Sequence, residues 1–220
     1  MAIETRDVTE QVYEQVEAMI LDGTLVQGSR IPQEHLAKEL GISRTILLKA
    51  LYRLEHELLL ESIPRRGMFV RQIGTNEIID SLEIRIGVES VAVRLLARDI
   101  TNEQLDELHS YFSPFNGSSD QFDKKTYALA DRMFHLRILQ MTGNPILEKM
   151  KIIGNILFLA GAELWWPAEI SLQEHLDIIN ALAEHDSERA ANAMKRHLRN
   201  SLDNMKQVYA EPGMEIQSIS

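Results

Sequence analysis

Four residues in the second half of the chain have side chains that could bind one metal ion together. Asp131 and His135 lie four residues apart in a helical pattern and therefore project from the same face. His175 opens a later helical segment and His197 follows 22 residues further on. Two antiparallel helices joined near Asp186 could bring these two imidazoles level with one another. One carboxylate and three imidazoles suit Zn, Ni, Mn or Fe, with open positions for water or a ligand.

Spacing alone leaves other interpretations of this group open. The chain has seven histidines, and a helical chain of that composition often contains one acid/His pair four residues apart. A metal-free sensor with a structural polar cluster and a metal-dependent, hydrolase-like enzyme that activates water are the alternatives. No general base or nucleophile constellation accompanies the group, so we expect no enzyme. The remaining histidines are assigned surface or structural positions: His35, His56, His109 and His185.

The segments that would position the four residues are helical. We expect an all-α domain over residues 76–210, because apolar residues repeat with helical spacing and no strand alternation is found there. The loop Ser113–Ser119 and the sequence Trp165-Trp166-Pro167 interrupt the pattern, and Trp165-Trp166-Pro167 should end the fourth helix. Residues 211–220 should fray. The expected helices cover about 76–98, 102–112, 121–142, 144–164, 170–184 and 187–208.

Residues 1–72 indicate a different module. Helical patterns run from about 9 to 21 and from 33 to 40, and Ser43 is placed to cap a third helix that ends near His56. The short spacing between the second and third helices, with Gly41 in the turn, is typical of a helix-turn-helix. Two β-prone runs around Pro64–Gly67 then predict a hairpin. We expect a winged helix-turn-helix with a small β-hairpin wing.

The third helix has two distinct faces. Leu47, Ala50, Leu51 and Leu54 form its core face. The opposite face is polar, and side chains at the start of the helix and at the wing tip can contact phosphates or bases. For the helix alone, an ordinary solvated face is an equal alternative, but the adjoining wing favours DNA. The predicted DNA-binding residues are Ser43, Arg44, Thr45, Lys49, Arg53, Arg65, Arg66 and Gly67.

The distribution of charge supports this division. The 220 residues carry a formal net charge of -10, which by itself argues against a general polyanion binder. Residues 28–74, however, contain eight Lys or Arg against five Glu, whereas residues 75–220 contain 14 basic and 22 acidic residues. Cysteine is absent, so thiolate ligands and disulfides are excluded. No apolar run reaches the roughly 18 residues of a membrane span, and the opening residues are acidic, so we expect a soluble, cytoplasmic protein.

The N-terminal motifs resemble the winged-helix domain of GntR-type bacterial transcription regulators. The resemblance runs from Ile31 to Val70 and departs from the family at one place. The family usually reads Pro-Val-Arg-Glu-Ala after Ser-Arg-Thr, where this chain has Ile46-Leu47-Leu48-Lys49-Ala50. Leu48 therefore replaces an arginine expected to touch bases, and it either packs or contacts a thymine methyl. The motifs that carry the resemblance are Leu36-Ala37-x-x-Leu40-Gly41-Ile42-Ser43-Arg44-Thr45, Ala50-Leu51-x-Arg53-Leu54-Glu55 and Arg66-Gly67-x-Phe69-Val70.

Residues from about Ile78 to Leu202 resemble the sensor domain of the fatty-acid-regulator branch of that family, the FCD domain. In metal-binding, VanR-like members an Asp, the following His and two later His bind one ion. The resemblance implies a divalent ion here, zinc first with nickel, manganese and iron as alternatives, at Asp131, His135, His175 and His197. The motifs that carry it are Glu83-x-Arg85, Glu89, Asp131-x-x-x-His135, Thr142-Gly143-Asn144-Pro145, Glu174-His175, Ala181-Leu182 and Ala193-Met194-x-x-His197-Leu198.

The resemblance also suggests an effector and an assembly. Arg85 could hold the carboxylate of a small metabolite, because a guanidinium binds carboxylates bidentately, and an internal salt bridge with Glu83 or Glu89 is the alternative. The stretch between His135 and His175 is shorter than is common in the branch, which leaves the roles of the two tryptophans open. We expect a ligand-responsive regulator, acting as a repressor, whose homodimer binds double-stranded operator DNA with one recognition helix per half-site.

Overall fold

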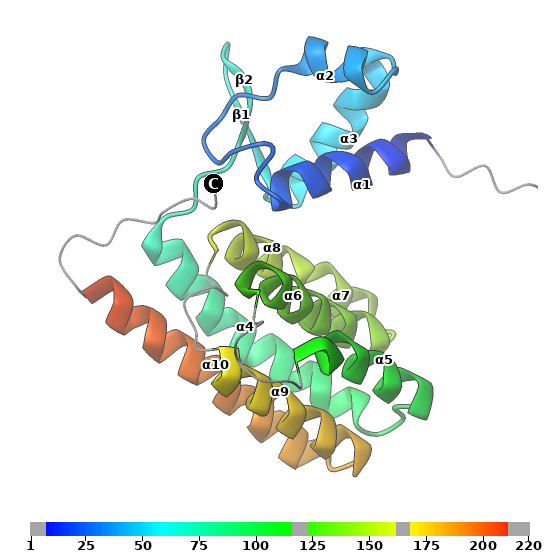
Figure 1. Cartoon of the computed structure of the whole chain (residues 1–220), viewed down its shortest axis with the longest axis vertical. Helices are drawn as coiled ribbons and strands as arrows, with labels where there is room; N and C mark the ends of the chain where they lie inside the picture. Colours follow the sequence, from blue (N-terminus) through cyan, green and yellow to red (C-terminus); the bar gives the residue numbers. More distant parts are fainter. Residues whose placement is uncertain (1–7, 116–122, 162–167, 211–220) are drawn as a thin grey trace, which may run out of the picture. The chain divides into compact units, whose positions relative to one another are not determined.

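The computed structural model describes residues 8–115, 123–161 and 168–210 (Figure 1). The chain divides into two compact units, the first ending at Ile73 and the second beginning at Gly74. The functional domain ranges 1–72 and 76–210 stay predictions, and their limits lie close to this division. No helix in the described part of the chain is long and apolar enough to cross a membrane.

The first unit is a helix-turn-helix followed by a wing. Its elements are α1 (Val8–Leu21), α2 (Gln33–Glu39), α3 (Arg44–His56), β1 (Leu60–Ile63) and β2 (Gly67–Val70). The strands are antiparallel, with Leu60 opposite Val70 and Ile63 opposite Gly67. β1 begins later than the β-prone run, because Leu58 has a φ of 59° and turns the chain before the strand. The predicted winged helix-turn-helix is therefore confirmed.

The recognition helix α3 is held by its cap and by its apolar face. The Ser43 hydroxyl accepts a hydrogen bond from the backbone N–H of Ile46, as expected of an N-cap residue. Gly41 in the preceding turn has a φ of 65°, which a residue with a side chain rarely adopts. α1 packs against α3. The predicted core face is fully buried: Leu47, Ala50, Leu51 and Leu54.

The elements of the second unit are all helices in its described residues. Its helices are α4 (Thr75–Leu96), α5 (Asn102–Phe112), the 3-10 turn η1 (Ser113–Phe115), α6 (Lys124–Met141), α7 (Pro145–Lys149), α8 (Lys151–Leu159), α9 (Ala168–Ala183) and α10 (Ser187–Ala210). α10 packs along α4 and α9, and α6 packs against α4, α5 and α8. The antiparallel pair α9 and α10 is visible in Figure 1. The predicted all-α second domain is confirmed.

The prediction of a single helix over 144–164 is wrong in detail. The chain forms two shorter helices, which meet at Met150, and the second ends at Leu159. Gly161 has a φ of 67°, so the chain leaves the helical conformation there rather than at the proline six residues later. The Trp165-Trp166-Pro167 segment lies outside the described residues. The same holds for Asn116–Ser119 of the predicted loop and for the predicted frayed end at 211–220.

Candidate metal centre and nucleic-acid surface

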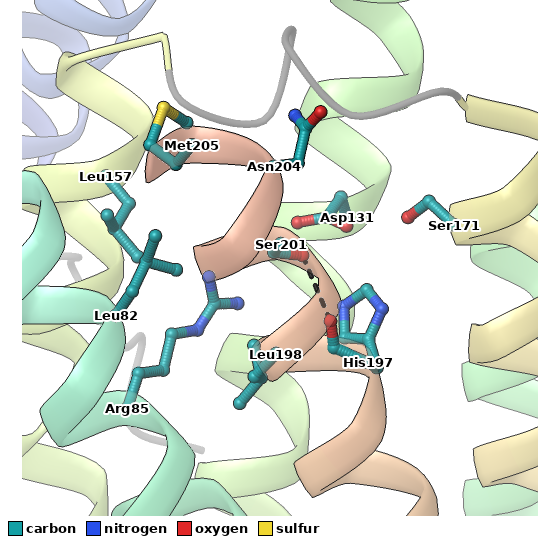
Figure 2. Close-up of a pocket in the computed structure, with 10 residues that line it drawn as sticks. All are labelled: Leu82, Arg85, Asp131, Leu157, Ser171, His197, Leu198, Ser201, Asn204 and Met205. Atoms are coloured by element: carbon teal, nitrogen blue, oxygen red, sulfur yellow. Dashed lines mark hydrogen bonds between the residues drawn. The ribbon is translucent and has the colours of Figure 1, made fainter. Parts of the chain in front are cut away.

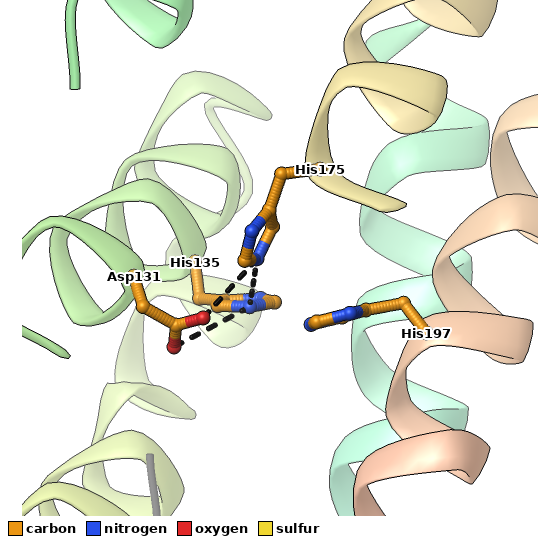
Figure 3. A group of neighbouring side chains, drawn as sticks. All are labelled: Asp131, His135, His175 and His197. Atoms are coloured by element: carbon orange, nitrogen blue, oxygen red, sulfur yellow. Dashed lines mark hydrogen bonds and ion pairs between the residues drawn. The ribbon is translucent and has the colours of Figure 1, made fainter. Parts of the chain in front are cut away.

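The second unit brings together all four candidate metal ligands. Asp131 and His135 come from α6, His175 from α9 and His197 from α10, and the four side chains point toward a common centre (Figure 3). All four are buried, and one potential ligand atom from each lies within 4.8 Å of the others. Nε2 of His175 lies 3.2 Å from Nε2 of His135 and 3.2 Å from Oδ1 of Asp131. Two imidazole nitrogens this close need a proton or a cation between them.

Two buried carboxylates orient two of the histidines through hydrogen bonds on the side away from the centre. Nδ1 of His135 hydrogen-bonds to the carboxylate of Glu89 on α4. Nδ1 of His197 lies 2.8 Å from Oε2 of Glu174. An imidazole that donates Nδ1–H to a carboxylate directs the lone pair of its Nε2 the other way, as is usual for metal-bound histidines. Sequence reasoning missed this orienting role, although both glutamates lie within motifs of the FCD resemblance.

His175 is oriented by a hydroxyl group. The Tyr127 hydroxyl on α6 lies 3.1 Å from Nδ1 of His175, and Ser171 Oγ lies at 3.5 Å. The imidazole is fully buried and stacks on Phe112, with ring centroids 4.5 Å apart. With Nδ1–H directed to Tyr127, Nε2 of His175 faces the centre as in the other two histidines. No sequence spacing indicates this contact, because 48 residues separate the two side chains.

The electrostatics of the cluster favour neutral imidazoles at His135 and His175 beside an ionised Asp131. Burial, together with the positive charge of Arg85, lowers the pKa of His135 well below its usual value. Burial and the neighbouring His197 lower the pKa of His175 to about 4. Burial alone would raise the pKa of Asp131, but His135 and His175 outweigh it and lower that pKa. At neutral pH Asp131, His135 and His175 therefore have the protonation state in which such residues bind divalent cations.

Arg85 takes part in an internal ion pair and also lines a pocket. Its Nε donates to Glu89, one of the two salt bridges expected from the sequence, whereas Glu83 pairs with Lys206 at 3.0 Å. The pocket lies beside the cluster and contains about 430 Å³ of empty space, counted with the part open to solvent. Figure 2 shows Arg85 and His197 among the side chains that line it. The predicted contact of Arg85 with an effector stays a prediction.

The remaining histidines lie away from the cluster. All four are exposed, as assigned from the sequence: His35, His56, His109 and His185. None of them belongs to the buried group of potential ligands in the described part of the chain.

The predicted DNA-binding side chains lie on the surface of the first unit. Gly67 is half-buried, and the other seven are exposed: Ser43, Arg44, Thr45, Lys49, Arg53, Arg65 and Arg66. Arg30, which sequence reasoning included only in the local basic excess, lines one cleft with Arg44 and Gly67. Gly67 has a φ of 104°, and a Cβ there would lie 3.1 Å from Nε of Arg30. The turn end of the wing and the start of α3 thus present positive charge together.

Arg53 differs from the other predicted DNA contacts, because it is already bound within the first unit. It pairs with Glu10 on α1, and its Nε lies 3.4 Å from Oε1 of Glu57. Its guanidinium lies 3.7 Å from the ring centroid of Tyr13. A contact with DNA would have to replace these interactions, so its DNA contact stays a prediction. Leu48 is half-buried, which fits either packing or a contact at the edge of the groove.

A winged helix-turn-helix joined to an all-α domain is the architecture of a class of bacterial transcription regulators. Residues 8–70 match the bacterial regulatory proteins of the gntR family, and residues 80–200 match the FCD domain. The chain belongs to the GntR family of transcription regulators, in the branch that carries an FCD domain. It is a regulator and not an enzyme.

Relatives and solved structures agree with this assignment. The Nta operon transcriptional regulator of Aminobacter aminovorans is 28% identical over 82% of this chain and 86% of its own length. A probable D-xylose utilization operon repressor of Paenarthrobacter nicotinovorans is 26% identical over 87% and 85% of the two chains. The structure of E. coli McbR/YncC covers 92% of this chain and 99% of its own, with a TM-score of 0.77 at 24% identity. A GntR regulator from Rhodococcus sp. RHA1 covers 91% and 98%, with a TM-score of 0.72 at 22% identity, and both structures support the fold.

Proposed function

We propose that this protein is a cytoplasmic, homodimeric repressor. When a small carboxylate binds beside a divalent metal ion in the FCD domain, the dimer dissociates from its operator or changes its arrangement on it. The observation that carries the proposal is the buried convergence of one carboxylate and three imidazoles, each imidazole hydrogen-bonded at Nδ1 on its outer side. Asp131, His135, His175 and His197 would hold the ion, with zinc as the first expectation and nickel, manganese or iron as alternatives.

The pocket beside the centre supports a carboxylate effector. When bound, a divalent ion supplies positive charge and an open coordination position that a carboxylate oxygen can take. Arg85 lines the same pocket as Asp131 and His197, so a guanidinium and the centre face one space. Leu82, Leu157 and other apolar side chains complete the wall and would accommodate a short carbon chain. The dimer would have one arrangement that binds DNA and one that does not. The effector would change operator affinity to the extent that it binds these two arrangements with different affinity.

The effector half of the proposal predicts a metal-dependent gain in thermal stability. We expect at least one small carboxylate to raise the melting temperature of the zinc-loaded protein by an increment that is lost when the zinc is removed, because only the folded, loaded protein offers both partners. A thermal-shift screen of hydroxy and keto acids with and without Zn²⁺ measures it. Arg85→Gln should weaken the increment while zinc still binds. Carboxylates that act equally with and without zinc at this pocket would contradict the proposal.

The DNA half of the proposal predicts loss of operator affinity at the surface of the winged helix. Arg44→Ala and Arg65→Ala should each weaken binding to a duplex selected from a random-sequence library, by about 1–3 kcal/mol where a base contact is lost. A lost phosphate contact should instead reduce the slope of log affinity against log salt by about one. Fluorescence anisotropy over a range of salt concentrations separates the two effects. Arg98→Ala, which changes an exposed arginine of the other unit, is the control. Equal binding by all three variants would contradict the assignment of the DNA-binding surface to the winged helix.

A further inference from the structure

The segment that precedes α2 in the first unit is attached to the wing. Arg30 forms an antiparallel bridge with β2, and both of its neighbours in the chain are hydrogen-bonded to that strand. The carbonyl of Ser29 accepts from the N–H of Val70, and the N–H of Ile31 donates to the carbonyl of Met68, each at 2.9 Å. The wing therefore fixes the backbone from which the Arg30 side chain projects.

The guanidinium of Arg30 lies against the wing at the place where Gly67 leaves room for it. A Cβ on Gly67 would lie 3.1 Å from Nε, 3.5 Å from Nη2 and 3.7 Å from Cζ of Arg30. A side chain at position 67 would therefore press on the guanidinium, and the φ of 104° also disfavours one. Gly67 thus allows Arg30 to lie close to the turn end of the wing.

Arg30 lines an open cleft together with Arg44 at the start of α3. The cleft has about 1040 Å³ of empty space, counted with the part open to solvent, which is more than twice the 430 Å³ beside the candidate metal centre. Both arginines are exposed, and neither side chain has a hydrogen bond or ion pair with a residue that the structure describes. Glu34 is the one carboxylate of the wall, so the cleft has an excess of positive charge.

We propose that Arg30 is a further DNA-binding residue, which holds a phosphate of the operator backbone in this cleft. The inference rests on the proposed function, because it requires α3 to enter the major groove. Sugar-phosphate backbone borders that groove on both sides, so a cleft beside the start of α3 faces phosphates. A guanidinium binds a phosphate through two parallel N–H donors. Because the wing already positions Arg30, less conformational freedom is lost on binding.

The test compares Arg30→Gln and Arg30→Lys with the wild-type full-length protein. Fluorescence anisotropy over a range of salt concentrations measures binding to the selected operator duplex and to an unrelated duplex of equal length. Arg30→Gln should weaken binding to both duplexes by a similar factor, roughly tenfold, and should reduce the slope of log affinity against log salt by about one. Arg30→Lys keeps the charge and should keep the slope. Arg98→Gln, which changes an exposed arginine of the second unit, is the control.

A phosphate contact and a purely structural role of Arg30 give different results. If Arg30 only packs on the wing, both variants should lower the melting temperature and leave the salt slope unchanged, which would overturn the proposal. A loss confined to the operator duplex would also overturn it, because it would indicate a base contact. An unchanged slope in Arg30→Gln removes only the role of Arg30. A wild-type protein without salt-dependent binding to any duplex would contradict the proposed function as well.

Discussion

The His197→Gln variant is expected to lose more than roughly 10–100-fold in metal affinity. That is the loss typically caused by substituting a residue that only hydrogen-bonds to a metal ligand. Glutamine keeps a polar group near Glu174 but removes Nε2, one of the four donor atoms of the candidate centre. The purified protein should contain close to one divalent ion per chain by elemental analysis, and the variant should contain far less. His109→Gln, which changes an exposed histidine, should retain the ion.

The same loss should appear as lower thermal stability. A ligand present at about a thousandfold above its dissociation constant stabilises the folded state by about 4 kcal/mol. For a chain of this size, each kcal/mol shifts the melting temperature by about 2–4 °C. Adding zinc to the chelated wild-type protein should produce this shift, and adding it to the His197→Gln variant should not. A native protein that contains no metal and binds none on titration would instead support a metal-free sensor with a structural polar cluster.

The elements of this protein could be predicted from its sequence where local signals decide the structure. The start of α3 depends only on residues close together in the sequence. The structure has these features as expected: the Ser43 cap, Gly41 in the turn and the apolar face from Leu47 to Leu54. The break at Met150 could not be predicted, because both halves of 145–159 have helical composition and no proline or glycine marks the junction.

The candidate centre shows the same limit at longer range. Asp131 and His135 share one helical face, so their proximity follows from spacing alone. The orienting contacts do not, because Glu89 and His135 are 46 residues apart and meet only through the packing of α4 on α6. Arg53 illustrates the opposite case: its place on the polar face predicted a DNA contact, whereas α1 supplies Glu10 as a partner 43 residues away. Helical periodicity gives the face of a side chain but not the neighbour that occupies it.

The Glu89→Gln variant should lose both stability and metal affinity, because one buried carboxylate holds two groups in place. Glu89 is 3% exposed and accepts hydrogen bonds from Arg85, itself 5% exposed, and from His135. Removing its charge leaves the Arg85 guanidinium buried, and breaking a buried ion pair costs about 3–5 kcal/mol. Asp131 also attracts Arg85, so we expect the lower end of that range. Urea unfolding of the chelated protein measures the loss.

Glu83→Gln is the matched control, since Glu83 lies six residues earlier on α4 and forms an exposed pair with Lys206. Its loss should cost less than about 1 kcal/mol. Metal affinity should fall roughly 10–100-fold in Glu89→Gln although all four donor atoms remain, because His135 loses its charged partner. The Arg85→Met/Glu89→Met double variant should recover stability, as replacing a whole buried pair often does, without recovering metal affinity. Recovery of both would show that Glu89 balances the charge of Arg85 and does not position His135.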